Sequence, residues 1–268
     1  MLKDITLGQF FPGESFIHRL DPRTKLIMVV VYIVALFMAS NWLGYGIVIA
    51  FLAVCIKIST IPLKSITRGL KPVMMIVAFT GILNLFFTPG DYYVFELGFL
   101  HVSNVGLRNA VFMVLRIMLL IMGTFLMTYT TSPISLTDGL ERLLGGLKKL
   151  HVPVHELAMM MSIALRFIPT LIEETDKIMC AQRARGADFD SGNLIQKAKA
   201  MIPILVPLFI SAFRRADELA TAMECRCYHG GEGRTKLHVL KYEGRDYVAL
   251  VLGALVLAAV IVLRRFGI

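Results

Sequence analysis

Two arginines lie in similar short contexts and could each bind a carboxylate or carbonyl group of a partner. One stands in Ala184–Arg185–Gly186 and the other in Cys225–Arg226–Cys227. Each triplet ends a predicted amphipathic helix, and its small flanking residues would let that helix end approach a partner closely. A guanidinium group offers five donors in a planar fork that fits carboxylates. The alternative interpretation is that each arginine only complements the negative end of its helix dipole.

No complete catalytic or metal-binding motif accompanies these arginines. His155–Glu156 lacks the second histidine of a His-Glu-x-x-His motif, and His151 with His155 supplies two ligands where zinc needs more. Gly230–Lys236 is rich in glycine but has the wrong order for a phosphate-binding loop. We therefore predict no catalytic residue, no metal site and no cofactor on this chain, so that any ATP would bind to another subunit.

The composition indicates a membrane protein. The chain has 268 residues, of which 56% are hydrophobic and 18% charged, and its mean hydropathy is +0.70. Soluble domains carry about 25% charged residues. Lys and Arg number 28 against 19 acidic residues, which gives a formal charge of +9. A nucleic-acid binder could show this excess, but the long apolar blocks favour a membrane protein with basic cytoplasmic loops and no nucleic-acid partner.

The apolar blocks predict an all-α integral membrane protein with about five transmembrane helices. The N-terminal membrane domain, residues 1–130, would hold four of them, and the C-terminal segment 246–268 would hold the fifth. Pro72 is expected to open the third helix. Arg116 within the fourth is unusual, because a charged side chain inside a span faces protein or water instead of lipid. The four N-terminal helices are predicted at about 24–40, 43–58, 72–88 and 107–130.

Basic residues set the predicted orientation. The loop 57–71 carries four Lys or Arg residues and the loop 89–106 carries none, so the former and the N terminus are expected in the cytoplasm. Five spans then place the C terminus outside. Arg264 and Arg265 argue against this placement, because basic residues favour the cytoplasmic side. The first 25 residues contain no secretory apolar segment, so the first apolar block is expected to remain as an anchor of a multi-pass cell-membrane protein.

Residues 131–245 form a predicted cytoplasmic helical coupling domain with two long helices. The first is predicted over Val154–Ala184, where apolar residues recur at helical spacing in the first half and acidic residues gather in the second. The second is predicted to end near Tyr228 and to be broken by Pro203 and Pro207. Helices that begin apolar and end polar could link a membrane to the cytosol.

The two arginine triplets, on successive predicted cytoplasmic helices, resemble the coupling helices of the transmembrane T component of energy-coupling factor (ECF) transporters, the EcfT and CbiQ family. Gly13–Lys25 resembles the N-terminal signature of this family, a serine followed by His-x-Leu-Asp-Pro-Arg-x-Lys before the first span. Arg215–Arg226 resembles the second coupling segment, in which Cys225 replaces the more usual alanine. The signature residues in this chain, whose implied role is structural, are Ser15, His18, Asp21, Pro22, Arg23 and Lys25.

The resemblance implies a non-catalytic subunit of an ATP-driven uptake transporter in a prokaryotic cell membrane. Two ABC-type ATPase subunits, which carry ATP and Mg²⁺, would each receive one of Arg185 and Arg226. The coupling helices would pass the ATPase motion to a small membrane-embedded S component that binds a vitamin. The T component of a dedicated cobalt or nickel transporter is the alternative within the family.

Three consecutive methionines, Met159, Met160 and Met161, are the residues expected to contact the S component. Methionine suits a surface that repacks against several partners, although a methionine run also occurs in ordinary cores.

Two other classes of function are weighed against transport. An intramembrane enzyme would need clustered polar residues in its spans, and Arg116, Asn84 and a few Ser or Thr residues are poor material for acid–base chemistry. A scaffold without energy coupling would make the two arginine triplets accidental.

Overall fold

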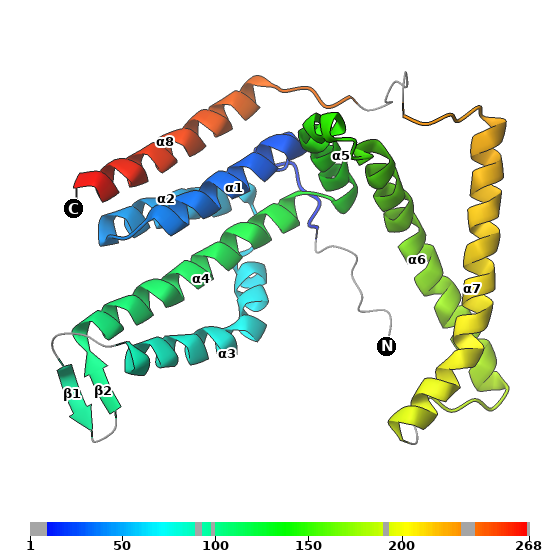
Figure 1. Ribbon diagram of the computed structural model, residues 1–268, viewed down its shortest axis with the longest axis horizontal. Coiled ribbons are helices and arrows are strands. Elements are labelled where there is room, and N and C mark those ends of the chain that lie inside the picture. The colour runs from blue at the N-terminus through cyan, green and yellow to red at the C-terminus, as the bar shows by residue number, and fades with distance from the viewer. Residues whose placement is uncertain (1–9, 89–92, 98–99, 190–192, 232–238, 267–268) are drawn as a thin grey trace. The chain divides into compact units, whose positions relative to one another are not determined.

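The computed structural model describes residues 10–88, 93–97, 100–189, 193–231 and 239–266. The chain divides into two compact units. The first, the helical body, consists of Gly8–Gly139 and Leu240–Ile268, and the second, the paired-helix unit, contains Leu140–Val239. Figure 1 shows the elements of both units.

Long helices make up the helical body, and a short hairpin connects two of them. α1 packs on α8 and α4, and α3 packs along α4. Strands β1 (Tyr93–Leu97) and β2 (Leu100–Ser103) pair antiparallel, with Leu97 opposite Leu100. The helices are α1 (Pro22–Met38), α2 (Trp42–Ser59), α3 (Leu63–Phe87), α4 (Asn104–Thr130) and α8 (Gly244–Phe266).

The core of the helical body lies where α1, α2, α4 and α8 meet. Tyr32, Val48, Leu119 and Val260 are buried there, and the Tyr32 hydroxyl donates to the Leu119 carbonyl at 2.7 Å. Gly123 lets α4 approach α1, because a Cβ at this position would lie 2.4 Å from Cε1 of the Tyr32 ring. Small residues at helix contacts allow this close packing in membrane proteins.

The paired-helix unit is built on two long helices that pack against each other, α6 (Val154–Ala184) and α7 (Leu194–Cys225) (Figure 1). α5 (Pro133–Leu144) and a 3₁₀ segment, Gly145–Leu150, precede them. Glu141 of α5 pairs with Nδ1 of His155 in the first turn of α6 at 2.9 Å. α6 has the bounds predicted from the sequence.

Six helices of the described residues are long and apolar enough to cross a membrane, namely α2, α3, α4, α6, α7 and α8. α1, with 17 residues, is shorter than each of these. The prediction of an all-α membrane protein is confirmed, with the β1–β2 hairpin as a small addition to it. α6 and α7 meet the same criterion of length and composition, although charged residues gather in their second halves.

Three prolines that were predicted to open or break a helix lie inside continuous helices, which corrects the predicted boundaries. α3 begins at Leu63, so Pro72 lies within it and does not open it. Pro203 and Pro207 likewise do not break α7. Each proline removes one backbone donor, a local cost that packing against neighbouring helices outweighs. In α7, Pro207 cannot donate to the Pro203 carbonyl, and the side-chain amide of Gln182 donates to that carbonyl instead, at 3.3 Å.

We expect Gly123→Ala to destabilise the helical body by about 1–3 kcal/mol, because the new methyl group overlaps the Tyr32 ring, which is held by its hydrogen bond. Thermal unfolding of the purified chain in detergent measures this. Gly46→Ala in α2 is the matched control, since a Cβ there meets nothing within 4 Å. Equal unfolding temperatures for the two variants would contradict the close approach of α4 to α1.

Candidate functional site

α6 ends in a Schellman motif around Arg185. The Gly186 N–H donates to the Arg183 carbonyl at 2.9 Å, and the Ala187 N–H donates to the Gln182 carbonyl at 3.0 Å. Gly186 has φ +88°, a left-handed conformation that glycine adopts readily. These bonds satisfy the last carbonyl groups of the helix and leave Arg185 exposed as its C-cap.

α7 ends in the same way around Arg226. The Cys227 N–H donates to the Glu224 carbonyl at 2.8 Å, and the Tyr228 N–H donates to the Met223 carbonyl at 3.0 Å. Cys227 has φ +55°, and Arg226 is exposed at the end of the helix. The same hydrogen-bond pattern therefore surrounds the arginine of each triplet.

The two triplets share one backbone geometry. In each, the first residue, Ala184 or Cys225, ends the helix and is exposed. The third residue adopts the left-handed conformation, which costs a non-glycine residue about 1–2 kcal/mol. The sequence analysis attributed the small third residue to close approach to a partner. The structure adds a second reason, which is that this residue has a positive φ. Both arginines are presented outward at positions where they also complement the helix dipole.

Two polar contacts fix the crossing of α6 and α7 between these ends. Glu174 of α6 accepts hydrogen bonds from the Ser211 hydroxyl and the Arg215 guanidinium of α7. The second contact is the bond from Gln182 to the Pro203 carbonyl. Because residue numbers rise along α6 as they fall along α7 between the two contacts, the helices are antiparallel. Charge-assisted bonds of this kind are stronger than neutral ones, so they brace one helix against the other.

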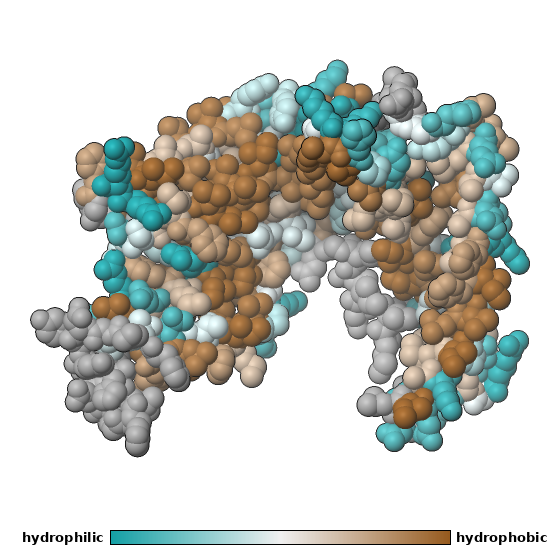
Figure 2. Space-filling model, viewed as in Figure 1, coloured by the Kyte–Doolittle hydropathy of each residue, from teal (hydrophilic) through white to brown (hydrophobic). Residues whose placement is uncertain are grey.

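The predicted S-component residues lie on α6 and are largely exposed. Met160 and Met161 are 55% and 54% exposed, and Met159 is half-buried. Figure 2 shows apolar surface along both helices of this unit. Extensive exposed apolar surface is typical of contact with lipid or with another protein. The exposed apolar side chains of α7 include Met201, Ile202, Leu205, Phe209 and Phe213.

The signature residues join the start of α1 to the end of α4. The Asp21 carboxylate caps α1 by accepting from the Arg23 N–H at 2.8 Å and also holds the Arg23 guanidinium in a bidentate pair. Pro22 takes the first helical position, where its missing N–H has no helical partner to lose. Lys25 is buried and donates to the Thr130 carbonyl at 2.8 Å.

Ser15 and His18 order the segment before α1. The Ser15 hydroxyl lies 2.6 Å from Nδ1 of His18, and Nε2 of His18 lies 3.0 Å from the Phe11 carbonyl. Partial burial lowers the pKa of His18 below its ordinary value, which favours the neutral ring. A neutral ring with its proton on Nε2 donates to Phe11 and accepts from Ser15, so the role of both residues is structural.

Asp246 completes this polar cluster, and the sequence analysis missed it. It lies in the first turn of α8 and is 2% exposed. Its two carboxylate oxygens accept from the Asp21 N–H and from the Glu243 N–H, each at 2.9 Å. Arg23 meanwhile stacks on Tyr242, 3.9 Å from the ring centroid. An acidic residue in a first helical turn is an ordinary capping signal, and only the fold reveals its contact with α1.

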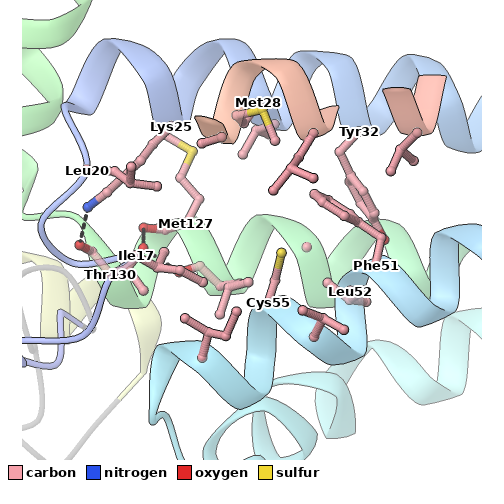
Figure 3. A pocket seen from close by; sticks show the side chains of 18 of the residues that line it. Ile17, Leu20, Lys25, Met28, Tyr32, Phe51, Leu52, Cys55, Met127 and Thr130 are labelled. Carbon is pink, nitrogen blue, oxygen red and sulfur yellow. Dashed lines mark hydrogen bonds between the residues drawn. The ribbon is translucent and has the colours of Figure 1, made fainter. Parts of the chain in front are cut away.

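An apolar cavity of about 460 Å³ lies between α1, α2, α4 and α8, beside the signature (Figure 3). Met28, Tyr32, Phe51 and Cys55 are among its lining residues, and Lys25 lies at one end with its ammonium group bonded to Thr130. The side chains that line it are almost all apolar, so this cavity offers space without a group of residues for acid–base chemistry.

Comparisons with known proteins identify the family. The family model for CbiQ, described as a cobalt transport protein, matches residues 13–237. Three similar proteins are each named energy-coupling factor transporter transmembrane protein EcfT. That of Clostridium kluyveri is 56% identical over 266 residues, 99% of this chain and 98% of the relative. That of Thermosediminibacter oceani is 52% identical over 265 residues, 99% of both chains. That of Bacillus subtilis is 48% identical over 265 residues, 99% of this chain and the whole relative.

The fold and these matches define a multi-pass membrane component of a transporter. The chain belongs to the CbiQ/EcfT family of transmembrane components of energy-coupling factor transporters. The resemblance inferred from the arginine triplets and the N-terminal signature is thereby confirmed.

We expect Gly186→Ala to loosen the end of α6 by about 1 kcal/mol, because alanine disfavours the left-handed conformation. Hydrogen exchange of the amides at positions 186 and 187, followed by mass spectrometry, should become faster. Gly146→Ala is the matched control, since both sites have room for a Cβ and only Gly186 has a positive φ. Cys227→Gly should slow exchange at the end of α7. Unchanged exchange in Gly186→Ala would contradict the requirement for a left-handed residue at the third position of the triplet.

Asp246→Asn should destabilise the chain by about 2–3 kcal/mol, because the amide NH₂ would face one of the two backbone N–H donors that the carboxylate accepts from. Thermal unfolding in detergent measures the loss. Glu243→Gln is the control, since Glu243 is exposed and its ion pair with Arg245 is long, at 3.8 Å, and therefore weak. If the two substitutions had the same effect, Asp246 would not be the link between α1 and α8.

Proposed function

We propose that this chain is the energy-coupling T component of an ECF-type vitamin uptake transporter. In this role it transmits the ATP-driven motion of two ATPase subunits to a small membrane-embedded S component that binds the substrate. The chain itself is a non-catalytic subunit, and ATP and Mg²⁺ bind to the ATPases. The names of its relatives, transmembrane proteins of energy-coupling factor transporters, support this assignment.

The observation that carries the proposal is the shared geometry of the two helix ends. Arg185 and Arg226 are both exposed C-caps of Schellman motifs. Two like binding elements suit two like partners, such as a pair of ABC-type ATPases. Each guanidinium would enter an acidic or carbonyl-lined groove of one ATPase, where its planar fork makes paired hydrogen bonds.

The braced crossing of α6 and α7 supports transmission of force. A displacement of one helix end can act on the other helix through Glu174, Ser211 and Arg215. The apolar surface that includes Met159, Met160 and Met161 is the proposed contact with the S component, because flexible methionine side chains can repack against different partners.

The proposed orientation places the N terminus and the coupling helices in the cytoplasm of a prokaryotic cell, where ATP is available. It follows from the four basic residues between positions 57 and 71, around the connection of α2 to α3, and from the absence of Lys and Arg between positions 89 and 106. The alternative is the T component of a dedicated cobalt or nickel transporter, and the description of the matching family model as a cobalt transport protein supports the cobalt form of this alternative.

The double substitution Arg185→Ala with Arg226→Ala tests the coupling role. We expect co-purification with the ATPases and ATP-driven uptake into vesicles to fall at least about tenfold, because buried interfacial arginines rank among the residues that contribute most to binding. Lys177→Ala with Arg214→Ala is the matched control, since both cations are exposed on the same helices but away from the ends.

Unchanged association and uptake in a correctly folded double variant would remove the two arginines from the mechanism and leave the helix-dipole interpretation. Uptake assayed with vitamins and with Co²⁺ or Ni²⁺ in the presence of the cognate S component separates the two kinds of substrate.

A further inference from the structure

A second cavity of the helical body contains two arginines that the coupling mechanism does not use. Its volume is about 700 Å³, and it lies between α1, α3 and α4. Arg108 and Arg116 of α4 both line it, together with the polar side chains of Ser40, Asn84 and Asn109. Among the described residues that line it, none carries a carboxylate. Ionisable residues inside spanning helices are costly and mark binding sites or pathways.

The two arginines differ in how far the protein satisfies them. Arg116 donates from Nε to the Tyr45 hydroxyl at 3.0 Å and from Nη2 to the Ala39 carbonyl at 3.2 Å. Ala39 is the C-cap of α1, so Arg116 also faces the negative end of a helix dipole. Arg108 is exposed and lies over the Phe112 ring at 5.4 Å. Within the described part of the chain, its guanidinium has no carboxylate partner.

The remaining basic residues of this end of the helical body add to the positive charge. Arg264 near the end of α8 contacts Met38 at the end of α1, with Nη1 3.2 Å from Sδ, and Arg265 follows it. By the rule that basic residues favour the cytoplasmic side, Arg264 and Arg265 argue against an outward C terminus. An anionic lipid surface at this end would offset their charge, since basic residues near a membrane surface attract acidic lipids.

We propose that this cavity binds an anionic phospholipid, with the headgroup phosphate on Arg108 and the acyl chains extending along α4 past Arg116. The guanidinium of Arg108 suits a bidentate phosphate contact. Arg116 lies eight residues farther along α4, about 12 Å deeper at 1.5 Å per residue, at the depth of the acyl chains, and its guanidinium is already bonded to Tyr45 and Ala39. Apolar side chains of the cavity at that depth, Ile117 and Leu120, contact the chains.

Native mass spectrometry of the full chain in mild detergent tests this assignment. The chain is titrated with phosphatidylglycerol and with phosphatidylcholine that carry identical acyl chains. Both lipids carry the phosphate, but the choline cation of phosphatidylcholine offsets its attraction to the two arginines. Wild-type chain should therefore bind phosphatidylglycerol about tenfold more tightly, and Arg108→Gln should remove most of that preference. Arg108→Lys, which keeps the charge without the fork, should keep part of it.

Lys57→Gln is the matched control, an exposed cation at the end of α2 that does not line the cavity. It should keep the full preference for phosphatidylglycerol, and unfolding temperatures verify that each variant is folded. Equal binding of the two lipids by wild type, or equal losses in Lys57→Gln and Arg108→Gln, would overturn the proposal.

Two further measurements separate the lipid from other sources of the same chemistry. Inorganic phosphate or glycerophosphate that displaces the lipid at equal concentration would make the cavity a free-anion site. Loss of the lipid adduct when the chain is assembled with its transporter partners would assign the cavity to a protein contact. Either result would overturn the proposal, whereas retention of phosphatidylglycerol in the assembled complex supports it.

Discussion

A helix end exposes backbone carbonyl and N–H groups that have no partner within the helix. Where water is scarce, as within a membrane, other protein groups must satisfy them. In the helical body, a local capping residue and side chains from other helices do so. Asp21 caps the start of α1, and Arg116 donates to the Ala39 carbonyl at its end. Lys25 donates to the carbonyl of Thr130, the last residue of α4. The arrangement of these helices depends on this satisfaction of their ends.

The N-terminal signature is best understood as a set of such contacts. Asp246 accepts the N–H of Asp21 and so ties the start of α8 to the start of α1. The bidentate pair between Asp21 and Arg23 keeps the buried carboxylate from being left uncompensated, which is the costly state for a charge removed from water. Three helix ends are thus held by a few charged residues that lie close together in space.

The ends of α6 and α7 are satisfied in a different way. Their last carbonyl groups accept from the backbone N–H groups of the residues that follow, through Gly186 and Cys227 in left-handed conformations. Because the backbone caps itself, the side chains of Arg185 and Arg226 are not consumed by capping. In the proposed function this leaves them available to a partner, in contrast to Arg116, whose donors are partly occupied within the protein.

The sequence by itself determined the membrane class, the family, the bounds of α6 and the positions of both arginine triplets, because apolar periodicity and capping residues are local signals. It placed prolines at helix breaks, whereas Pro72, Pro203 and Pro207 lie within helices. Only the tertiary structure decided these positions, since packing and the donor group of Gln182 outweigh a local propensity. The tertiary structure alone also gave Asp246 its role, because a contact across 225 residues leaves no periodic or local trace in the chain.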